Sequence, residues 1–513
     1  MAIAFRIVPK EYRDSVSLMQ LSALLSKLPG VEQASAVMAT ENNVALLAEA
    51  GLGVSATGAT ATDLLVVVRG EASALPAVID EALKNLTRQA SAVNGRTETS
   101  LAPRSIQMAR AESGPAQMAL ISTPGEYAAA EAMKALWLGL NVMLFSDNVS
   151  EQDELRLKQA ARARGLIVMG PDCGTAIVNG IPLAFANVVR RGPIGAVGAS
   201  GTGLQEVTVL VDRLGSGISQ AIGTGGRDLQ SSIGGISMLT ALRDLAGDPA
   251  TKVIVLISKP PAAEVTERIL SEARKAAKPV VVVFIGADPA RLTGGNVHGA
   301  RTLEDAAYTA VALAQGELRE ARHAEDSTSP TGVPRFAARQ RYIRGLFSGG
   351  TFCYEAVLLL DERLRDLYSN TPARPAGALS DLWHSHHHTL IDLGDDLFTR
   401  GRPHPMIDYR LRNERIVKEA ADAETAVILL DVVLGYGSHA DPAAELVPAI
   451  GRARAVASAQ GRNLVFVAHV CGTQGDPQGF QRQADALTHA GVMLARSNAH
   501  AARLAASIVQ GRG

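Results

Sequence analysis

Two short stretches of this sequence repeat one another and decide how it folds: Gly198-Ala-Ser-Gly-Thr-Gly-Leu-Gln-Glu206 and Ser348-Gly-Gly-Thr-Phe-Cys-Tyr-Glu355. Each follows an apolar run and opens a helical pattern, and each reads Gly-Thr, three residues, then Glu. A second strand then ends in a glycine-rich or acidic turn, at 223–228 in one copy and at 392–396 in the other. This internal repeat predicts duplicated domains that face each other.

Alternating strands and helices surround both copies. Continuous apolar runs such as 253–257 and 280–283 are typical of parallel strands that helices cover on both faces. The sequence therefore predicts doubly wound α/β domains. We expect strands at 118–122, 141–145, 165–169, 195–198, 219–222, 252–258, 279–285, 343–347, 390–393, 426–431 and 463–469.

The first ninety residues form a smaller α+β pattern of their own. Strands at 4–8, 31–38 and 63–68 alternate with helices at 14–28, 42–50 and 75–86. Two β-α-β arms with short links predict a ferredoxin-like sandwich over residues 1–90. Polar segments rich in Ser, Arg, Glu and Pro, at 89–117 and 316–340, are interpreted as linkers.

Composition and charge narrow the function classes. Of 513 residues, 47% are hydrophobic, and 50 basic residues balance 51 acidic ones. Such a balance gives no field that attracts nucleic acid or an anionic membrane. The N-terminus lacks the apolar core of a signal peptide, and no apolar run is long enough to span a membrane. Three distant cysteines (Cys173, Cys353 and Cys471) do not make a disulfide framework. We therefore expect a cytoplasmic protein.

The repeated loops have the chemistry of an anion site. A strand that ends in small residues at a helix start exposes unpaired N–H groups, and the helix dipole adds about half a positive charge. Phosphate or acyl phosphate is therefore expected at both loops, held mainly by backbone donors and without a lysine. The alternative is a tight turn packed on its own sheet. The predicted phosphate-binding residues are Ser200, Gly201, Thr202, Gly349, Gly350 and Thr351.

Glu206 and Glu355 lie about one turn into their helices, where they can point back toward the loops. They are predicted to be catalytic, with a solvated face or a capping role as the alternative.

The motifs resemble a known family. Residues 169–175, 198–206 and 223–228 follow the order seen in succinyl-CoA synthetase α subunits, and the C-terminal block resembles the matching β-subunit ligase domain. Asp392-Leu-Gly-Asp-Asp396 with Gly401-Arg-Pro-His-Pro-Met-Ile-Asp408, together with the small N-terminal domain, resembles the FdrA family. The resemblance implies flavodoxin-like parallel sheets in a CoA-binding-like domain (117–190), an α-subunit-like ligase domain (191–315) and a β-subunit-like ligase domain (342–513).

Two departures bear on the activity that the resemblance implies. In the synthetases, two facing helix N-termini hold a phosphohistidine in a Met-Gly-His-Ala-Gly loop. This loop is missing here, and we do not expect His298 to replace its histidine, although that alternative stays open. The first glycine-rich CoA loop and an ATP-grasp domain are missing too. The FdrA resemblance implies phosphate-dependent carbamoyl or acyl transfer, as a subunit of an oxamate carbamoyltransferase. The alternatives are an NDP-forming acid–CoA ligase completed by a separate nucleotide-binding chain, and a non-catalytic scaffold.

Further residues complete the predicted site. Gly225 and Gly226 line the second turn, while Arg227 and Arg402, each beside a glycine, can clamp a substrate carboxylate. The alternative interpretation is that Arg227 and Arg402 are surface arginines in turns. His404, between two prolines, is predicted to be catalytic.

No metal site is predicted, because the run His384-Ser-His-His-His388 has no cysteine or spaced carboxylate partner. The loop 469–477 is expected after the last apolar strand. We expect phosphate as a substrate, with CoA as a possible ligand and other subunits as partners.

Overall fold

The computed structural model describes residues 2–54, 58–93, 103–316, 333–400 and 402–511. They form two compact units. The smaller unit comprises Met1–Val142, Ser146–Val149 and Asp395–Asp408. The larger unit comprises Met143–Phe145, Ser150–Gly394 and Tyr409–Gly513. No helix of the described residues is long and apolar enough to cross a membrane.

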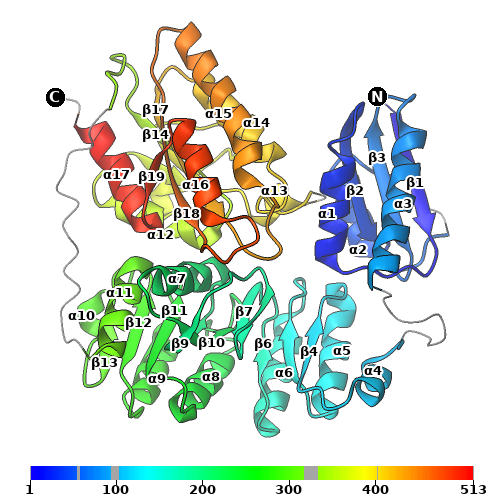
Figure 1. Ribbon diagram of the computed structural model, residues 1–513, viewed down its shortest axis with the longest axis vertical. Helices are drawn as coiled ribbons and strands as arrows, with labels where there is room; N and C mark the ends of the chain where they lie inside the picture. The colour runs from blue at the N-terminus through cyan, green and yellow to red at the C-terminus, as the bar shows by residue number, and fades with distance from the viewer. Residues whose placement is uncertain (1, 55–57, 94–102, 317–332, 401, 512–513) are drawn as a thin grey trace. The chain divides into compact units, whose positions relative to one another are not determined.

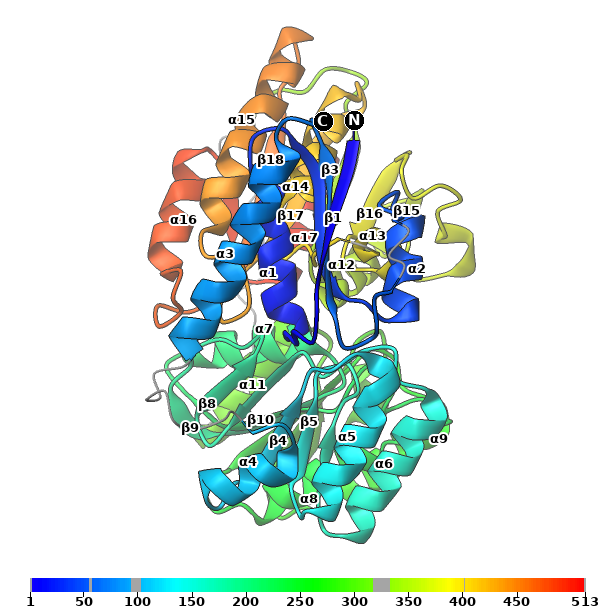
Figure 2. The same ribbon diagram turned by 90° about the vertical axis from the view of Figure 1, so that its right-hand side faces the viewer.

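The smaller unit begins with an α+β sandwich. Strands β1, β3 and β2 pair antiparallel in that order. Figure 2 shows α1 and α3 on one face of this sheet and α2 on the other. Leucines of α1 and α3 pack on β3, and Leu47 of α2 packs on its opposite face. The bounds are β1 (Ala2–Val8), α1 (Ser15–Leu25), β2 (Val31–Met38), α2 (Glu41–Glu49), β3 (Leu64–Gly70) and α3 (Leu75–Val93).

The predicted first linker contains helix. Helix α3 continues to Val93, and α4 (Ile106–Ser113) begins where the side chain of Ser105 accepts a hydrogen bond from Met108 N. The middle of the expected linker lies outside the described residues. A three-stranded sheet then follows in the order β4-β5-β6, with α5 and α6 in the connections. The bounds are β4 (Met118–Ile121), α5 (Gly125–Trp137), β5 (Asn141–Leu144), α6 (Glu151–Ala163) and β6 (Val168–Met169).

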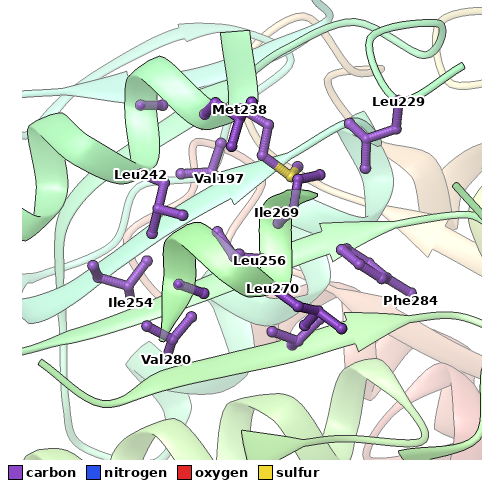
Figure 3. Close-up of a cluster of buried hydrophobic side chains, with 14 of the residues drawn as sticks. Val197, Leu229, Met238, Leu242, Ile254, Leu256, Ile269, Leu270, Val280 and Phe284 are labelled. Atoms are coloured by element: carbon purple, nitrogen blue, oxygen red, sulfur yellow. The ribbon is translucent and has the colours of Figure 1, made fainter. Parts of the chain in front are cut away.

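A seven-stranded sheet carries the first repeat, in the order β13-β12-β11-β9-β10-β7-β8. Strands β9 to β13 are parallel, whereas β7 pairs antiparallel with both β10 and β8. Helices α8 and α9 cover one face and form the apolar core that Figure 3 shows around Met238, Leu256 and Ile269. The bounds are β7 (Thr175–Val178), β8 (Ile181–Ala184), β9 (Arg191–Gly198), α7 (Gly201–Arg213), β10 (Ile218–Gly223), α8 (Ile236–Gly247), β11 (Val253–Ser258), α9 (Ala263–Ala273), β12 (Val280–Phe284), α10 (Pro289–Leu292), β13 (Val297–Gly299) and α11 (Leu303–Ala314).

A six-stranded parallel sheet carries the second repeat, in the order β15-β16-β14-β17-β18-β19. Helices α12 and α17 pack against each other and against this sheet, while α14, α15 and α16 form a second helical layer (Figure 1). The bounds are β14 (Tyr342–Phe347), α12 (Gly350–Asp361), β15 (Leu367–Ser369), β16 (His388–Asp392), α13 (Asp396–Thr399), α14 (Arg410–Ala421), β17 (Thr425–Val433), α15 (Pro442–Ala459), β18 (Val465–Cys471), α16 (Phe480–His489), β19 (Met493–Ala495) and α17 (Asn498–Gln510).

The two sheets share one topology, which confirms the predicted doubly wound fold. Counting from β9, strands β10-β9-β11-β12-β13 run in the order 2-1-3-4-5, and β16-β14-β17-β18-β19 run in the same order when β15 is left aside. This is the flavodoxin-like order, whose ligand crevice lies at the carboxyl ends of the first strands. Each repeated loop therefore occupies the topological switch point of its own sheet.

Some elements were not predicted. The hairpin β7–β8 belongs to the sheet of β9, so the sheet crosses the expected domain boundary at residue 190. Its turn, Asn179-Gly180, has positive φ at both residues, as the commonest two-residue hairpin turn requires. Strands β13, β15 and β19 have three residues each, too few for a periodic pattern. Strand β18 extends to Cys471, so His469 lies within the strand and not in a loop.

Candidate functional site

The two repeated loops meet in the larger unit. Ser200 Oγ at the start of α7 lies 2.6 Å from Thr351 Oγ1 at the start of α12, a hydrogen bond between the two copies of the repeat. Ser200 Oγ also accepts from Gly203 N at 2.9 Å and so caps its own helix. The two domains therefore face each other at these loops, as the internal repeat predicts.

The pair of loops is partly open to solvent. Ser200, Gly201 and Gly350 are half-buried, whereas Thr202 and Thr351 are buried. The first N–H groups of any helix have no partner within that helix. The first N–H groups of both helices therefore lie near the half-buried residues, and Ser200 Oγ already accepts from one of them, Gly203 N.

A buried carboxylate fixes the second loop. Asp431, at the end of β17, accepts from Ser348 N at 2.8 Å and from Gly349 N at 2.8 Å. Arg412 donates to the same carboxylate at 2.7 Å, and both side chains are fully buried. This network sets the direction in which the first turn of α12 points.

Asp392 stands beside the start of α12. A Cβ built on Gly350 would lie 2.4 Å from Asp392 Oδ2, so only glycine permits this approach. Asp392 Oδ1 accepts from Gly394 N at 2.9 Å. The α12 N-terminus therefore already has one internal anion next to it.

Lys259 lies near α12, although the sequence predicted no lysine at this site. Lys259 comes directly after β11, the strand next to β9, and Ala199 N donates to Ile257 O at 2.9 Å. Its Nζ lies 5.9 Å from the centroid of the Tyr354 ring on α12. The available signal was its position after an apolar strand, because the carboxyl ends of neighbouring parallel strands share one sheet edge.

Glu206 and Glu355 make reciprocal contacts between the two halves. Glu206, on α7, accepts from Asn498 N at the start of α17 at 3.0 Å. Glu355, on α12, accepts from Leu303 N at the start of α11 at 2.8 Å. Each carboxylate thus satisfies the first turn of the last helix of the other half, where the helix dipole favours negative charge. Both side chains are buried, and neither lies on a solvated face.

His469 makes the two glutamates unequal. Its Nε2 lies 3.2 Å from Glu206 Oε2, and its Nδ1 is buried without a hydrogen-bond partner among the described residues. Burial would lower the pKa of His469, but the charge of Glu206 outweighs it and the pKa is raised. Burial would raise the pKa of Glu206, yet the charge and hydrogen bond of His469 lower it.

Glu355 has no such cation. Burial raises its pKa to about 7, and the charge of Glu206 adds to this rise, against hydrogen bonds from Asn498 and Leu303. Asn498 Nδ2 donates to Glu355 Oε2 at 2.8 Å. The pair of repeat glutamates thus combines one ionised and one readily protonated carboxyl group in a dry interface.

The second predicted turn is built around a different network. Gly225 has φ +86°, and a Cβ there would lie 2.3 Å from Pro171 O, while Gly226 is exposed. Arg227 Nε donates to the buried Glu154 at 3.0 Å, so this guanidinium already has a carboxylate partner inside the protein. Glu154 is also paired with the fully buried Lys158 at 2.8 Å.

The remaining candidates lie elsewhere. Arg402 and His404 belong to the smaller unit; Arg402 is exposed, and His404 Nδ1 accepts from Met406 N at 3.2 Å. His384 is exposed and pairs with Asp381. The described residues contain no cluster of three or more His, Cys, Asp or Glu suited to a metal ion. Burial raises the pKa of Cys173 to about 12, which fits a packing residue better than a nucleophile.

Three family models match this chain. The model described as CoA binding domain matches residues 190–286, which lie almost entirely in the predicted α-subunit-like ligase domain (191–315) and not in the predicted CoA-binding-like domain (117–190). The CoA-ligase model matches residues 346–508. The model described as AllF, heavy metal-associated domain, matches residues 1–103. That stretch contains neither cysteine nor histidine, so it lacks the thiolate and imidazole ligands that soft transition metals prefer.

Several known proteins are similar to this chain. It is 28% identical to a succinate–CoA ligase (ADP-forming) subunit alpha-2 of Trichomonas vaginalis, over 40% of this chain and 70% of that protein. A solved dinucleotide-forming acetyl-coenzyme A synthetase 1 of Ca. Korarchaeum cryptofilum, in complex with phosphate and ADP, is 12% identical with a TM-score of 0.35, over 81% and 86% of the two chains. The chain is also 44% identical to the uncharacterized protein YahF of Escherichia coli (strain K12), over 99% of each. This protein therefore belongs to the family of YahF, a family of FdrA-like proteins of the CoA-ligase type.

Proposed function

We propose that this chain catalyses acyl transfer of the CoA-ligase type, with phosphate or acyl phosphate held between α7 and α12. The observation that carries the proposal is the 2.6 Å contact between Ser200 Oγ and Thr351 Oγ1, which brings two helix N-termini to one place. Two converging helix dipoles stabilise a multiply charged anion more strongly than a single helix dipole does. Lys259 adds a full positive charge beside α12.

The proposed step is exchange between an acyl phosphate and an acyl thioester. The thiol of CoA attacks the acyl carbon, a C–S bond forms, the C–O bond to phosphate breaks, and the thiol proton is lost. N–H groups of the first turns of α7 and α12, with the hydroxyls of Ser200 and Thr351, would hold the phosphate oxygens. Backbone donors fixed in a partly dry site need no reorganisation as the leaving phosphate gains charge.

Glu206 and Glu355 fit a positioning role in this scheme. Each is buried and accepts from a helix N–H of the other half, at 3.0 Å and 2.8 Å. They would hold α7 and α12 in the relative orientation that the loops need. Gly225, Gly226, Arg227 and Arg402 remain proposed contacts of the phosphate or acyl phosphate, and His404 remains a proposed catalytic residue.

A partner chain is part of the proposal. The Trichomonas vaginalis relative is an α subunit of an ADP-forming ligase, so we infer that nucleotide chemistry resides in a separate chain here as well. Carbamoyl transfer from oxalurate to phosphate, the reaction first expected from the sequence, uses the same kind of anion site. A non-catalytic scaffold role is the third candidate function. One half-reaction gives a different result for each of the three candidate functions.

Phosphorolysis of a thioester tests the proposal without the partner, because it needs no nucleotide. The purified chain is incubated with succinyl-CoA or acetyl-CoA and inorganic phosphate, and free thiol is measured. We expect thiol release that depends on phosphate and is lost in Gly201→Val. Carbamoyl phosphate formed from oxalurate and phosphate, with no thiol release, would replace the proposal by carbamoyl transfer. If neither free thiol nor carbamoyl phosphate is formed, the non-catalytic scaffold role is the function that remains.

A further inference from the structure

A cavity lies at the opposite edge of the second sheet from the α7–α12 loops. Its volume is about 350 Å³, and it opens where β18 and β19 begin. The loop residues Ser348, Asp392 and Asp431 all lie at the carboxyl ends of strands in this sheet, so the cavity is at the amino-end edge. Its lining residues are Pro334, Arg454, Ser458, Arg462, Asn463, Leu464, Val465, Gly491 and Met493.

Two arginines line the cavity without a carboxylate. Arg454 donates to Ala490 O and, at 2.7 Å, to Gly491 O. Arg462 Nη2 donates to Ala420 O at 2.6 Å and to the amide oxygen of Gln460. All of these acceptors are neutral, and no ion pair joins either guanidinium to an acidic group in the described part of the chain.

Arg462 also has an unused donor. The side chain is 7% exposed, and its Nη1 is buried with no hydrogen-bond partner among the described residues. Nη1 is covered by neighbouring atoms in this structure, and a buried donor of a charged group that lacks a partner is costly. A small turn of the guanidinium that brings Nη1 to an ionised oxygen in the cavity would therefore be favourable. Burial lowers the pKa of both Arg454 and Arg462, and at Arg462 the charge of Asp422 opposes this shift without reversing it.

The wall also has an apolar part. Leu464, Val465, Met493 and Pro334 line the cavity together with the polar residues Ser458 and Asn463. The volume is at the lower end of the range for small-molecule sites, which combine an apolar wall with a few polar groups that orient the ligand. Two cations and several aliphatic side chains in one wall favour a ligand that has both a charged group and an apolar part.

The geometry points to a second binding site in this chain, for a small organic oxyanion: a carboxylate or phosphate carried on an apolar body. The two guanidinium groups bind the oxyanion, and Leu464, Val465 and Met493 contact the apolar part. Strand β18 runs from Val465 in this wall to His469, which pairs with Glu206. The site is independent of the α7–α12 loops and does not rest on the proposed function.

Calorimetric titration of the full chain tests this site, with benzoate and phenyl phosphate as probes at constant ionic strength. We expect one probe to bind per chain, and Arg462→Gln to weaken it about tenfold, since it removes a charged donor. Arg452→Gln is the matched control: this exposed arginine lies on α15 but outside the cavity wall, and the affinity should not change. Stronger binding of one probe identifies the oxyanion.

A second variant covers the case in which Arg462→Gln unfolds. Ser458→Trp places a bulky side chain in the wall from an exposed position of α15 and leaves both arginines intact. Melting curves confirm folding, and this variant too should lose the probe. Equal affinities in the parent, Arg462→Gln and Ser458→Trp would overturn the site, as would no heat with either probe. Binding lost in Gly201→Val but kept in Arg462→Gln would assign the probe to the α7–α12 loops and also overturn it.

Discussion

Lys259 and Asp392 bring opposite charges to the start of α12. Lys259 Nζ lies 5.9 Å from the ring centroid of Tyr354, and Asp392 Oδ2 would be 2.4 Å from a Cβ at Gly350. A bound phosphate is attracted by the first and repelled by the second. The two residues should therefore change its affinity in opposite directions.

We predict that Lys259→Gln weakens phosphate binding about tenfold, the size of one hydrogen bond to a charged group. Asp392→Asn should strengthen it, because the amide keeps an acceptor for Gly394 N and removes the like charge. Lys252→Gln is the control, since Lys252 is exposed at the other end of the same strand. Calorimetric affinities that move in the same direction for both site variants would refute this electrostatic account.

Glu355 links the stability of the interface to pH. Its pKa rises from 4.5 to about 7 on folding, chiefly because of burial. The unfolded chain ionises this group first, so the free energy of unfolding is highest below pH 4.5 and falls as pH rises through 7. The total loss is about 3 kcal/mol, because raising a pKa by one corresponds to about 1.4 kcal/mol.

Glu355→Gln cannot ionise and should remove that loss. Denaturant unfolding at pH 4 and pH 8 measures it: the free energy of unfolding of the variant relative to wild type should rise by about 3 kcal/mol over this range. A difference that stays constant with pH would show that Glu355 is ionised in the native interface.

At the scale of elements, the first turn of α7 is the cleanest place to test anion binding. A Cβ at Gly201 meets only Thr175 Oγ1, at 3.3 Å, so a side chain fits the fold but fills the space in front of the N–H groups. At Gly350 a side chain would instead strike Asp392. Gly201→Val therefore separates ligand binding from folding better than Gly350→Val does.

We predict that Gly201→Val reduces phosphate affinity much more than Ser200→Ala. The hydroxyl of Ser200 is one donor among several, so its removal should cost about tenfold or less. Ser200→Ala should also lower stability by about 1 kcal/mol, because it removes the cap on Gly203 N. Calorimetry and melting curves on both variants check this. If folded Gly201→Val binds as tightly as wild type, the α7 loop is only a turn.

The sequence predicted the long elements well and the short ones poorly. Continuous apolar strands such as β11 and β17 are buried on both faces, which produces the pattern that identified them. The three-residue edge strands β13, β15 and β19 have no such pattern, and their pairing depends on neighbours far away in the chain. The β7–β8 hairpin had a usable signal in Asn179-Gly180, which the sequence analysis did not use.

At the scale of the whole molecule, the sequence indicated which residues repeat but not what they contact. The matched spacing of Glu206 and Glu355 was visible, whereas their partners Asn498 and Leu303 are brought near only by the packing of two sheets. His469 and Lys259 were misplaced or missed for the same reason: their roles arise from the neighbouring half. Gly201 and Thr351, by contrast, could be placed from a strand–loop–helix pattern alone.

The central claim is that both loops form one phosphate site, and the stoichiometry of phosphate binding tests it most directly. Inorganic phosphate is titrated into the Arg462→Gln protein, so that binding in the second cavity is weakened and contributes less heat. The account predicts one phosphate per chain, and both Gly201→Val on α7 and Thr351→Ala on α12 should weaken that same site. Two phosphates per chain, with Gly201→Val abolishing one and leaving the other unchanged, would contradict it.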